Sequence, residues 1–142
     1  MHELIFRRLT SAGDPDVPAI RDMLSGERFV SIDADSYFTY VTGTDGVYFY
    51  KIYMEGRLCA VLHAESTGRS LSVMITVVPN MRRQGIGKQV ISDLCRRLGE
   101  YGCTGAEAYI EPENTASAAL FRSCGFRRAA DEDGLQKWVY EI

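Results

Sequence analysis

The feature that most constrains this sequence is an apolar strand pattern followed, after a short basic loop, by a helix with one apolar face. Residues 70–78 are rich in aliphatic and β-branched residues, and Pro79 ends this strand because proline cannot donate to a strand ladder. Within 85–101 the apolar residues recur at helical spacing, namely Ile86, Val90, Ile91, Leu94, Cys95 and Leu98. A helix with one apolar stripe has to bury it, so the strand belongs to a sheet that helices cover.

Similar patterns predict the other elements. Asp14, Pro15 and Asp16 have the chemistry of a helix start, and the pair Glu55-Gly56 predicts a tight hairpin turn. The predicted strands are 3–7, 47–54, 58–64, 70–78, 106–110, 126–129 and 136–141, and the predicted helices are 14–24, 36–41, 85–101 and 114–124. This order predicts an α/β (α+β) fold with a mixed, largely antiparallel central sheet flanked by helices. The length fits a single domain over residues 1–142.

Composition excludes several classes of function. The chain carries 16 Lys and Arg against 19 Asp and Glu, a net charge of −3 that disfavours a nucleic-acid partner. Its longest apolar run has five residues, against ~20 in a membrane span, so we expect no membrane partner. Two histidines and four scattered cysteines form no metal-ligand spacing, and we expect no metal. The first nine residues lack a long apolar stretch, which favours the cytoplasm.

The segment between the strand and the helix has the chemistry of an anion site. Helix N-terminal amides lack intrahelical partners, and the helix dipole favours a negative charge beside them. Gly85 and Gly87 would let a ligand approach the backbone, and Arg82, Arg83 and Lys88 add positive charge. The segment therefore predicts a site for a phosphate or pyrophosphate group.

Two phosphate-binding motifs fit this segment poorly. A P-loop needs Gly at position 82 and Ser or Thr at 89, where this chain has Arg82 and Gln89. A dinucleotide fingerprint lacks its third glycine at Val90, although Glu107 stands at the distance where that motif places its ribose-binding acid. A nucleotide-binding domain is therefore a third-ranked alternative.

A third pattern matches. The spacing V-x-P-x-x-R-x-x-G-x-G (Val77, Pro79, Arg82, Gly85, Gly87) resembles the acyl-CoA loop of the GNAT acetyltransferase superfamily. Downstream, N-x-x-S-x-x-L-F-x-x-x-G-F, from Asn114 through Phe121 to Phe126, resembles a second motif of the same superfamily. The resemblance is close over residues 70–128 and implies acetyl-CoA as cosubstrate, without a metal.

The resemblance also implies roles for individual residues. Backbone groups of Val77 and Val78 would pair with the pantetheine arm as if it were an added strand. The other implied contacts to CoA are the amides of Arg83, Gln84, Gly85, Ile86, Gly87 and Lys88, the charge of Arg82, and the helix residues Asn114, Ser117 and Phe121.

Two positions depart from the family pattern. Many members carry Tyr where this chain has Phe121, and the strand 70–78 offers only Ser70, Ser72 and Thr76 where a catalytic Glu often lies. An attacking amine must still lose its ammonium proton, and a base or a water chain must accept it. The candidate bases are Glu111, which is preferred for its place after strand 106–110, and Glu65, Glu107 and His63. The candidate hydroxyl donors are Tyr109 and Tyr48.

The sequence therefore predicts an N-acetyltransferase that moves an acetyl group from acetyl-CoA to a primary amine of a small molecule or peptide. The alternative is a non-catalytic acyl-CoA-binding module, which the missing tyrosine hydroxyl favours. We expect the acceptor to contact roughly residues 20–45, and the protein to be a monomer or a homodimer.

Overall fold

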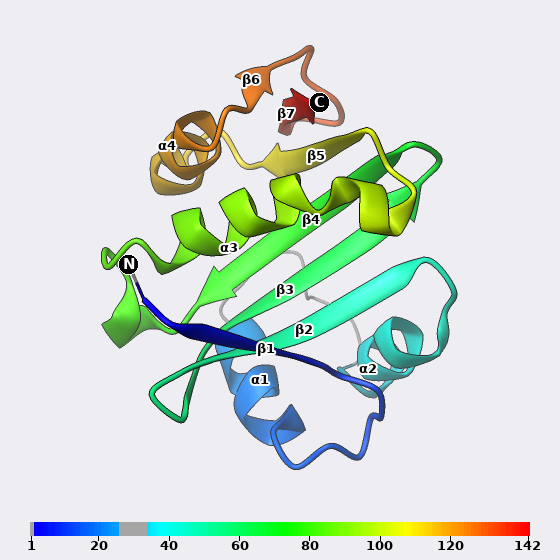
Figure 1. Ribbon diagram of the computed structural model, residues 1–142, viewed down its shortest axis with the longest axis vertical. Coiled ribbons are helices and arrows are strands. Elements are labelled where there is room, and N and C mark those ends of the chain that lie inside the picture. Colours follow the sequence, from blue (N-terminus) through cyan, green and yellow to red (C-terminus); the bar gives the residue numbers. More distant parts are fainter. Residues whose placement is uncertain (1, 26–33) are drawn as a thin grey trace.

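The structure is a computed structural model that describes residues 2–25 and 34–142 (Figure 1). Residues 26–33, which fall within the range expected to contact the acceptor, lie outside the described part. In chain order the elements are β1 (Leu4–Arg8), α1 (Val17–Leu24), α2 (Ala34–Gly43), β2 (Val47–Met54), β3 (Arg57–Thr67), β4 (Ser70–Val77), η1 (Pro79–Met81), α3 (Ile86–Arg96), η2 (Leu98–Tyr101), β5 (Gly105–Ile110), α4 (Thr115–Ser123), β6 (Arg127–Arg128) and β7 (Gln136–Glu141).

The strands form one seven-stranded sheet in the order β1-β2-β3-β4-β5-β7-β6. Every neighbouring pair is antiparallel except β4 and β5, which run parallel. The parallel pairing covers only three positions and ends at Ser72 opposite Glu107. Beyond that point β5 diverges from β4, as Figure 1 shows. The predicted mixed, largely antiparallel sheet flanked by helices is confirmed.

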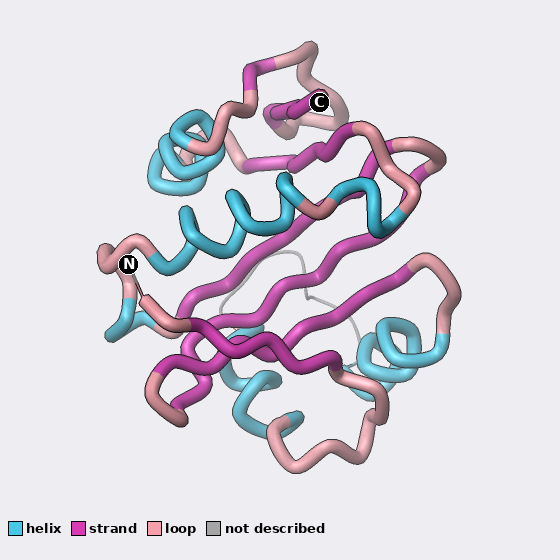
Figure 2. Tube along the Cα trace, in the orientation of Figure 1, coloured by secondary structure: helices cyan, strands magenta, loops and turns pink. Residues whose placement is uncertain are grey.

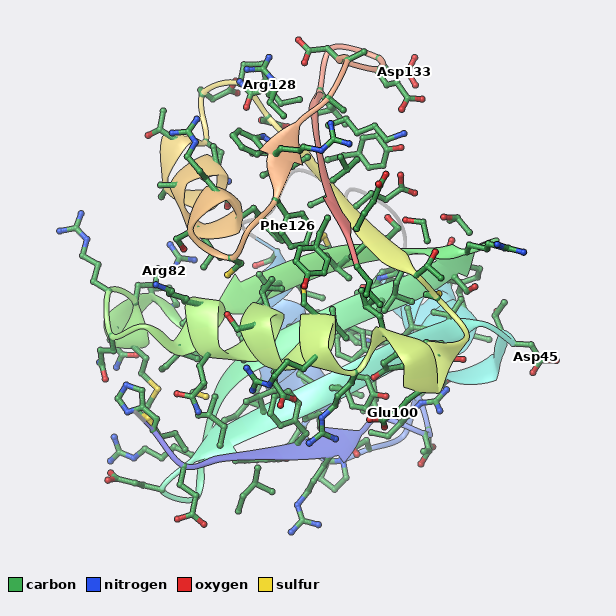
Figure 3. All side chains as sticks on the ribbon, turned by 45° about the horizontal axis from the view of Figure 1, so that its top comes forward. Asp45, Arg82, Glu100, Phe126, Arg128 and Asp133 are labelled. Atoms are coloured by element: carbon green, nitrogen blue, oxygen red, sulfur yellow. The ribbon has the colours of Figure 1, made fainter. Side chains whose placement is uncertain are left out.

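Helices cover both faces of the sheet (Figures 1 and 2). On one face, called the α3 face here, the apolar stripe of α3 packs with α4 against the sheet, and Phe121, Phe126 and Trp138 are buried there. On the other, called the α1 face, α1 and α2 pack against β2 and β3 around Phe38 and Phe49. Figure 3 shows Phe126 in the interior, whereas Asp45, Glu100 and Asp133 project from the surface.

Two sequence-based expectations about local structure need correction. The helix predicted over 85–101 is broken at Arg97, so that α3 ends and the 3-10 helix η2 follows. Gly99 lies in this last turn, where the high backbone entropy of glycine disfavours a regular α-helix. At the start of α1, Asp16 is the N-cap residue, but its carboxylate does not cap the helix.

The carboxylate of Asp16 instead joins a cluster that ties α1 to β2. Lys51 is 8% exposed, and its Nζ contacts Asp14 Oδ2 at 2.8 Å and Asp16 Oδ2 at 3.0 Å. The Tyr53 hydroxyl also donates to Asp16. Burial acts to lower the pKa of Lys51, but the hydrogen bonds to the two carboxylates outweigh it and raise the pKa above its ordinary value. The bond from Tyr53, followed by that from Lys51, lowers the pKa of Asp16.

We predict that Lys51→Met lowers the free energy of unfolding by about 1–3 kcal/mol at pH 7, because two carboxylates lose their shared cation. The folded-state pKa of Asp16 lies below its ordinary value of 3.8, so its contribution is present above that pH and is lost as the pH falls through the folded value. The difference between parent and variant should therefore shrink toward about pH 3. Urea unfolding of both proteins at pH 7 and at about pH 3 measures this difference in the free energy of unfolding. An equal difference at the two pH values would contradict the stabilising contact between Lys51 and Asp16.

Candidate active site

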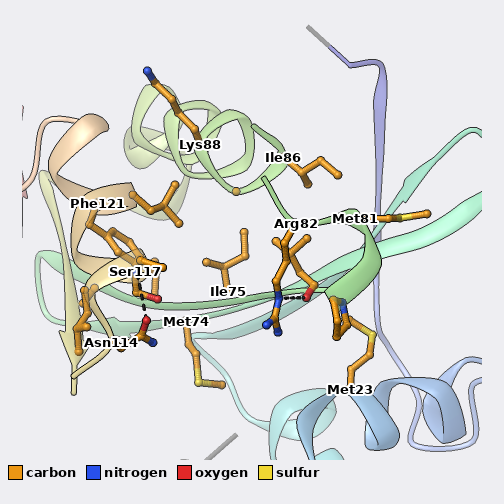
Figure 4. Close-up of a pocket in the computed structure, with 18 of the residues that line it drawn as sticks. Met23, Met74, Ile75, Met81, Arg82, Ile86, Lys88, Asn114, Ser117 and Phe121 are labelled. Atoms are coloured by element: carbon orange, nitrogen blue, oxygen red, sulfur yellow. Dashed lines mark hydrogen bonds between the residues drawn. The ribbon is translucent and has the colours of Figure 1, made fainter. Parts of the chain in front are cut away.

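The divergence of β4 and β5 opens a cleft with a volume of about 1130 Å³ (Figure 4). Strand β4 supplies one side, β5 and α4 the other, and the η1 segment with the start of α3 closes one end. The lining residues on these elements are Val73, Met74, Ile75, Val77, Pro79, Met81, Arg82, Arg83, Gly85, Ile86, Gly87, Lys88, Ala108, Tyr109, Ile110, Asn114, Ala116, Ser117, Leu120 and Phe121. Most of the residues predicted to contact CoA are therefore brought together.

The edge of β4 presents backbone groups to this cleft. The Val78 amide points toward β3 and donates to the Cys59 carbonyl at 2.8 Å, and the Val78 carbonyl accepts from the Met81 amide at 2.9 Å. Backbone direction alternates along a strand, so the amide and carbonyl groups of Val77 and Ile75 face the cleft. Among the predicted pantetheine partners, Val77 thus has a suitably directed backbone, whereas the amide of Val78 is already used within the sheet.

The loop after β4 is the segment for which the sequence predicts an anion site. Arg82 Nε donates to the Val77 carbonyl at 3.0 Å, which folds this side chain back along the end of β4 (Figure 4). Gly85 is the N-cap of α3, with a left-handed φ of +79° and no atom within 4 Å of the position of a Cβ. Without a capping side chain, the first amides of α3 lie open to a ligand. The Lys88 side chain extends away from the cleft in Figure 4.

Gly87 has a packing role beside the predicted contact to CoA. A Cβ at this position would lie 3.1 Å from Leu120 Cδ2 on α4. The glycine therefore allows α3 and α4 to approach closely. Open space at the Cβ position is found at Gly85, whereas contact of the Gly87 backbone with CoA stays a prediction.

Helix α4 forms the wall opposite β4. The Asn114 side chain caps α4 by accepting a hydrogen bond from the Ser117 amide at 3.1 Å. Ser117 and Phe121 are one turn apart, so both point to the cleft. Phe121 is 3% exposed, and its ring packs edge-on against Phe126 with centroids 5.0 Å apart.

Helix α1 contributes to the lining through Ala19, Asp22, Met23 and Ser25. The last three fall within the range 20–45 that the sequence predicts to contact the acceptor, and Figure 4 shows Met23 extending from α1. The helical spacing of α1 marks only its buried residues, Val17, Ile20 and Leu24. Nothing in the local sequence indicates against which strand the rest of this helix lies.

A cluster of ionisable groups lies on the α1 face beside the cleft. His63 Nδ1 is 2.8 Å from the Tyr37 hydroxyl, and His63 Nε2 is 3.5 Å from Glu65 Oε1. The Tyr40 hydroxyl donates to the same Glu65 oxygen at 2.6 Å. Burial lowers the pKa of His63, and the neighbouring Glu65 only partly opposes this shift. The histidine is therefore neutral at pH 7.

A second polar cluster on the α1 face surrounds Glu107. Its carboxylate accepts from Thr67 Oγ1 at 3.0 Å and lies 3.4 Å from Lys137 Nζ. The Tyr109 hydroxyl donates to Glu132 Oε2 at 3.2 Å and lies 3.5 Å from Glu107 Oε2. Burial, followed by the charge of Glu107, raises the pKa of Tyr109, so this phenol keeps its proton.

Seven predicted or candidate site residues lie outside the lining, namely Val78, Gln84, Tyr48 and Glu111 and the candidate bases His63, Glu65 and Glu107 described above. The backbone of Val78 belongs to the sheet ladder, and the Gln84 carbonyl contacts His2 Nε2 at 2.7 Å. Tyr48 packs against Tyr101, with ring centroids 4.8 Å apart. Glu111 follows β5 by one residue, and its carbonyl accepts from the Asn114 amide. Catalysis by Glu111 therefore stays a prediction.

No group of three His, Cys, Asp or Glu side chains with metal-site geometry occurs within residues 2–25 and 34–142. None of the helices in that same part of the chain is both long enough and apolar enough to cross a membrane.

Comparison with known proteins agrees with this geometry. The model of the acetyltransferase (GNAT) family matches residues 17–126. A curated relative, the L-2,4-diaminobutyric acid acetyltransferase of Nocardia farcinica, is 33% identical over 75 residues. That match covers 53% of this chain and 39% of the relative, so the chain spans well under half of the relative's length.

Solved structures share the fold at low sequence identity. The N-acetyltransferase PseH of Campylobacter jejuni, in complex with acetyl coenzyme A, has a TM-score of 0.79 at 11% identity, over 98% of this chain and 99% of that one. A mutant of the spermidine N-acetyltransferase SpeG of Vibrio cholerae has a TM-score of 0.80 at 13% identity, over 97% and 93% of the two chains. With a family model that matches most of its length, the chain belongs to the acetyltransferase (GNAT) family.

Proposed function

We propose that this protein is an N-acetyltransferase that moves the acetyl group of acetyl-CoA to a primary amine by direct attack. The observation that carries the proposal is the cleft between β4 and β5, with an open helix N-terminus at one end. Such a cleft offers a strand edge to an amide-containing arm and unpaired amides to a pyrophosphate. Both groups occur in CoA.

In this proposal the two ends of the cleft hold different parts of acetyl-CoA. The pyrophosphate binds the amides around Gly85 and the start of α3, and Arg82 and Arg83 balance its charge. The pantetheine arm pairs with the cleft-facing backbone groups of β4, with Asn114 and Ser117 on the opposite wall. The fit requires no metal.

The reaction needs a donor for the oxyanion and groups that transfer protons. A cleft-facing amide of β4, at Ile75 or Val77, can donate to the carbonyl oxygen as charge develops on it. Phe121 has no proton to give to the leaving thiolate. Tyr109 is the candidate acid, because it lines the cleft and its phenol stays protonated. Glu111 is the base that the sequence favours.

The acceptor is a primary amine whose identity the fold leaves open. The relatives named above act on diaminobutyrate and spermidine, according to their names, and both compounds carry amines that are cationic at neutral pH. Acidic side chains on the α1 face, Glu65 and Glu107, support a cationic acceptor here as well. We propose this class without a specific compound.

A non-catalytic acyl-CoA-binding module is the second candidate, favoured by Phe121 in place of a hydroxyl-bearing residue. Incubation with labelled acetyl-CoA and a panel of amines distinguishes the two. The panel comprises L-2,4-diaminobutyrate, spermidine, phosphinothricin and a lysine-containing peptide. Transfer of label to any amine supports the enzyme, whereas binding of CoA without transfer supports the module.

We predict that Gly85→Asp abolishes the rise in Tm that CoA gives the parent protein. A ligand that binds only the folded state stabilises it by RT ln(1 + [L]/Kd), so loss of binding removes the shift. Aspartate tolerates the left-handed conformation better than most residues, and here it places a negative charge at the proposed pyrophosphate site.

Gly56→Asp is the matched control, because Gly56 has φ +76° and open space around its Cβ position, but lies in the β2–β3 turn. Both variants should have a lower Tm than the parent in the absence of CoA. Gly56→Asp, unlike Gly85→Asp, should keep the full CoA-induced rise in Tm. Equal shifts in the two variants would contradict the location of the anion site.

Phe121→Tyr should leave CoA binding unchanged and leave acetyl transfer equal or faster. The phenol keeps the ring packing against Phe126 and adds a proton donor on the cleft wall. Thermal shift with CoA and steady-state kinetics measure the two effects. A loss of CoA affinity would mean that Phe121 only packs in the core. It would contradict its assignment to the position where many family members carry Tyr.

A further inference from the structure

We consider an approach of the amine acceptor to the end of the paired strands from the α1 face, where Glu65, Ser72 and Glu107 are only partly buried. The α3 face is filled there by the apolar residues of α3 and α4. On the α1 face, Ser72 is the last residue of β4 that pairs with β5. Ser72 directly precedes Val73 and Met74, which line the cleft, so the groups around Ser72 lie beside the cleft on this face.

Two carboxylates flank Ser72 in a single row across three strands. Ser72 is directly opposite Glu65 on β3 and directly opposite Glu107 on β5. Residues opposed in this way project to the same face, with Cβ atoms ~4.5–5.5 Å apart in an antiparallel pair. A glutamate side chain spans such a distance, so both carboxylates can reach the space over Ser72.

The two carboxylates differ in their partners. Glu107 is paired with Lys137 and also accepts from Thr67. Glu65 contacts a neutral tyrosine hydroxyl and a neutral histidine, and within the described residues no Lys or Arg forms an ion pair with it. An ammonium ion at Glu65 would therefore displace no cation of the described residues, whereas at Glu107 it would compete with Lys137.

The His63 ring faces Glu65 and helps to orient its carboxylate. In the tautomer with hydrogen on Nε2, the ring faces Glu65 with its N–H and accepts the Tyr37 hydroxyl at Nδ1. The ring is fixed by Tyr37 and by Phe49, whose ring centroids lie 5.7 Å and 6.3 Å from its own. On β4, the residue paired with His63 is Met74, which lines the cleft.

We propose that Glu65 accepts the ammonium proton of the acceptor amine, and that Tyr40 and His63 position its carboxylate. This inference rests on the proposed function and assigns the base to Glu65 in place of Glu111. The first N–H proton passes to Glu65, and the nitrogen lone pair then forms the N–C bond to the thioester carbon. As the C–S bond breaks, the nitrogen loses its second proton and the CoA thiolate gains one, which yields the amide and the free thiol. Glu65 then returns its proton to solvent.

The described groups that face Glu65 and His63 define the expected pH dependence. They are Tyr37 and Tyr40 from α2, Phe49 from β2, and Ser72 and Met74 from β4, with Glu107 beyond Ser72 on β5. No positive charge faces the pair within this set. Among the described residues, the carboxylate of Glu65 therefore has neutral hydrogen-bond partners only.

The experiment compares pH–rate profiles of Glu65→Gln and the parent with the fastest amine of the panel above. The variant should lose about 10²-fold or more in kcat at pH 7, the low end of general-base effects of ~10²–10⁴-fold. The loss should shrink as the pH approaches the pKa of the acceptor, because the amine is then already neutral. Tyr40→Phe should give a smaller loss in kcat and shift the acidic limb of the profile.

Controls separate this inference from the proposed function. Glu65→Gln should keep the full CoA-induced rise in Tm, and Glu100→Gln, on the exposed surface of η2, should match the parent in both assays. A Glu65→Gln profile that overlaps the parent's overturns the inference and leaves the function intact, as does a pH-dependent loss in Glu111→Gln alone. Absence of transfer by the parent to any amine overturns the function and the inference together.

Discussion

The parallel pairing of β4 with β5 is the constraint on which the site depends. It stops after three positions, although both strands continue, and none of the described strands fills the gap. If β4 stayed paired with β5 along its whole length, all its backbone groups would have partners within the sheet. The interruption leaves the groups of β4 that face the cleft without partners on β5. The same divergence separates strands β5 and β7, together with helix α4, from strands β1 to β4. One wall of the cleft therefore comes from β4 and the other from β5 and α4.

The chain order of the elements was predictable because each carries a local signal. Val47–Met54 is confirmed to the residue, since its aromatic and β-branched pattern is bounded by turns at Gly46 and Glu55-Gly56. The break at Arg97 was not predictable from the apolar stripe, which continues through Leu98. Periodicity reports which face is buried, and not whether the backbone stays α-helical.

Only the parts of the candidate site that are formed by contiguous residues were predictable from the sequence. The loop from Val77 to Lys88 and the helix from Asn114 carry their chemistry in contiguous residues, and both line the cleft. The position of Glu65 opposite Ser72 depends on the register between two strands, which spacing alone does not give. The role of Gly87 likewise depends on Leu120, a neighbour 33 positions away in the chain.

The arrangement of charge along the cleft favours a direction for each substrate. At one end, Arg82, Arg83 and the dipole of α3 attract an anion. At the paired end of β4 and β5, on the α1 face, Glu65 faces no described cation, and Glu107 shares one. In the proposed reaction, an anionic donor would bind at the first end and a cationic acceptor would approach from the second. A neutral or anionic acceptor would gain nothing from Glu65, so this arrangement of charge supports the proposed cationic amine before any contact to the rest of the acceptor is made.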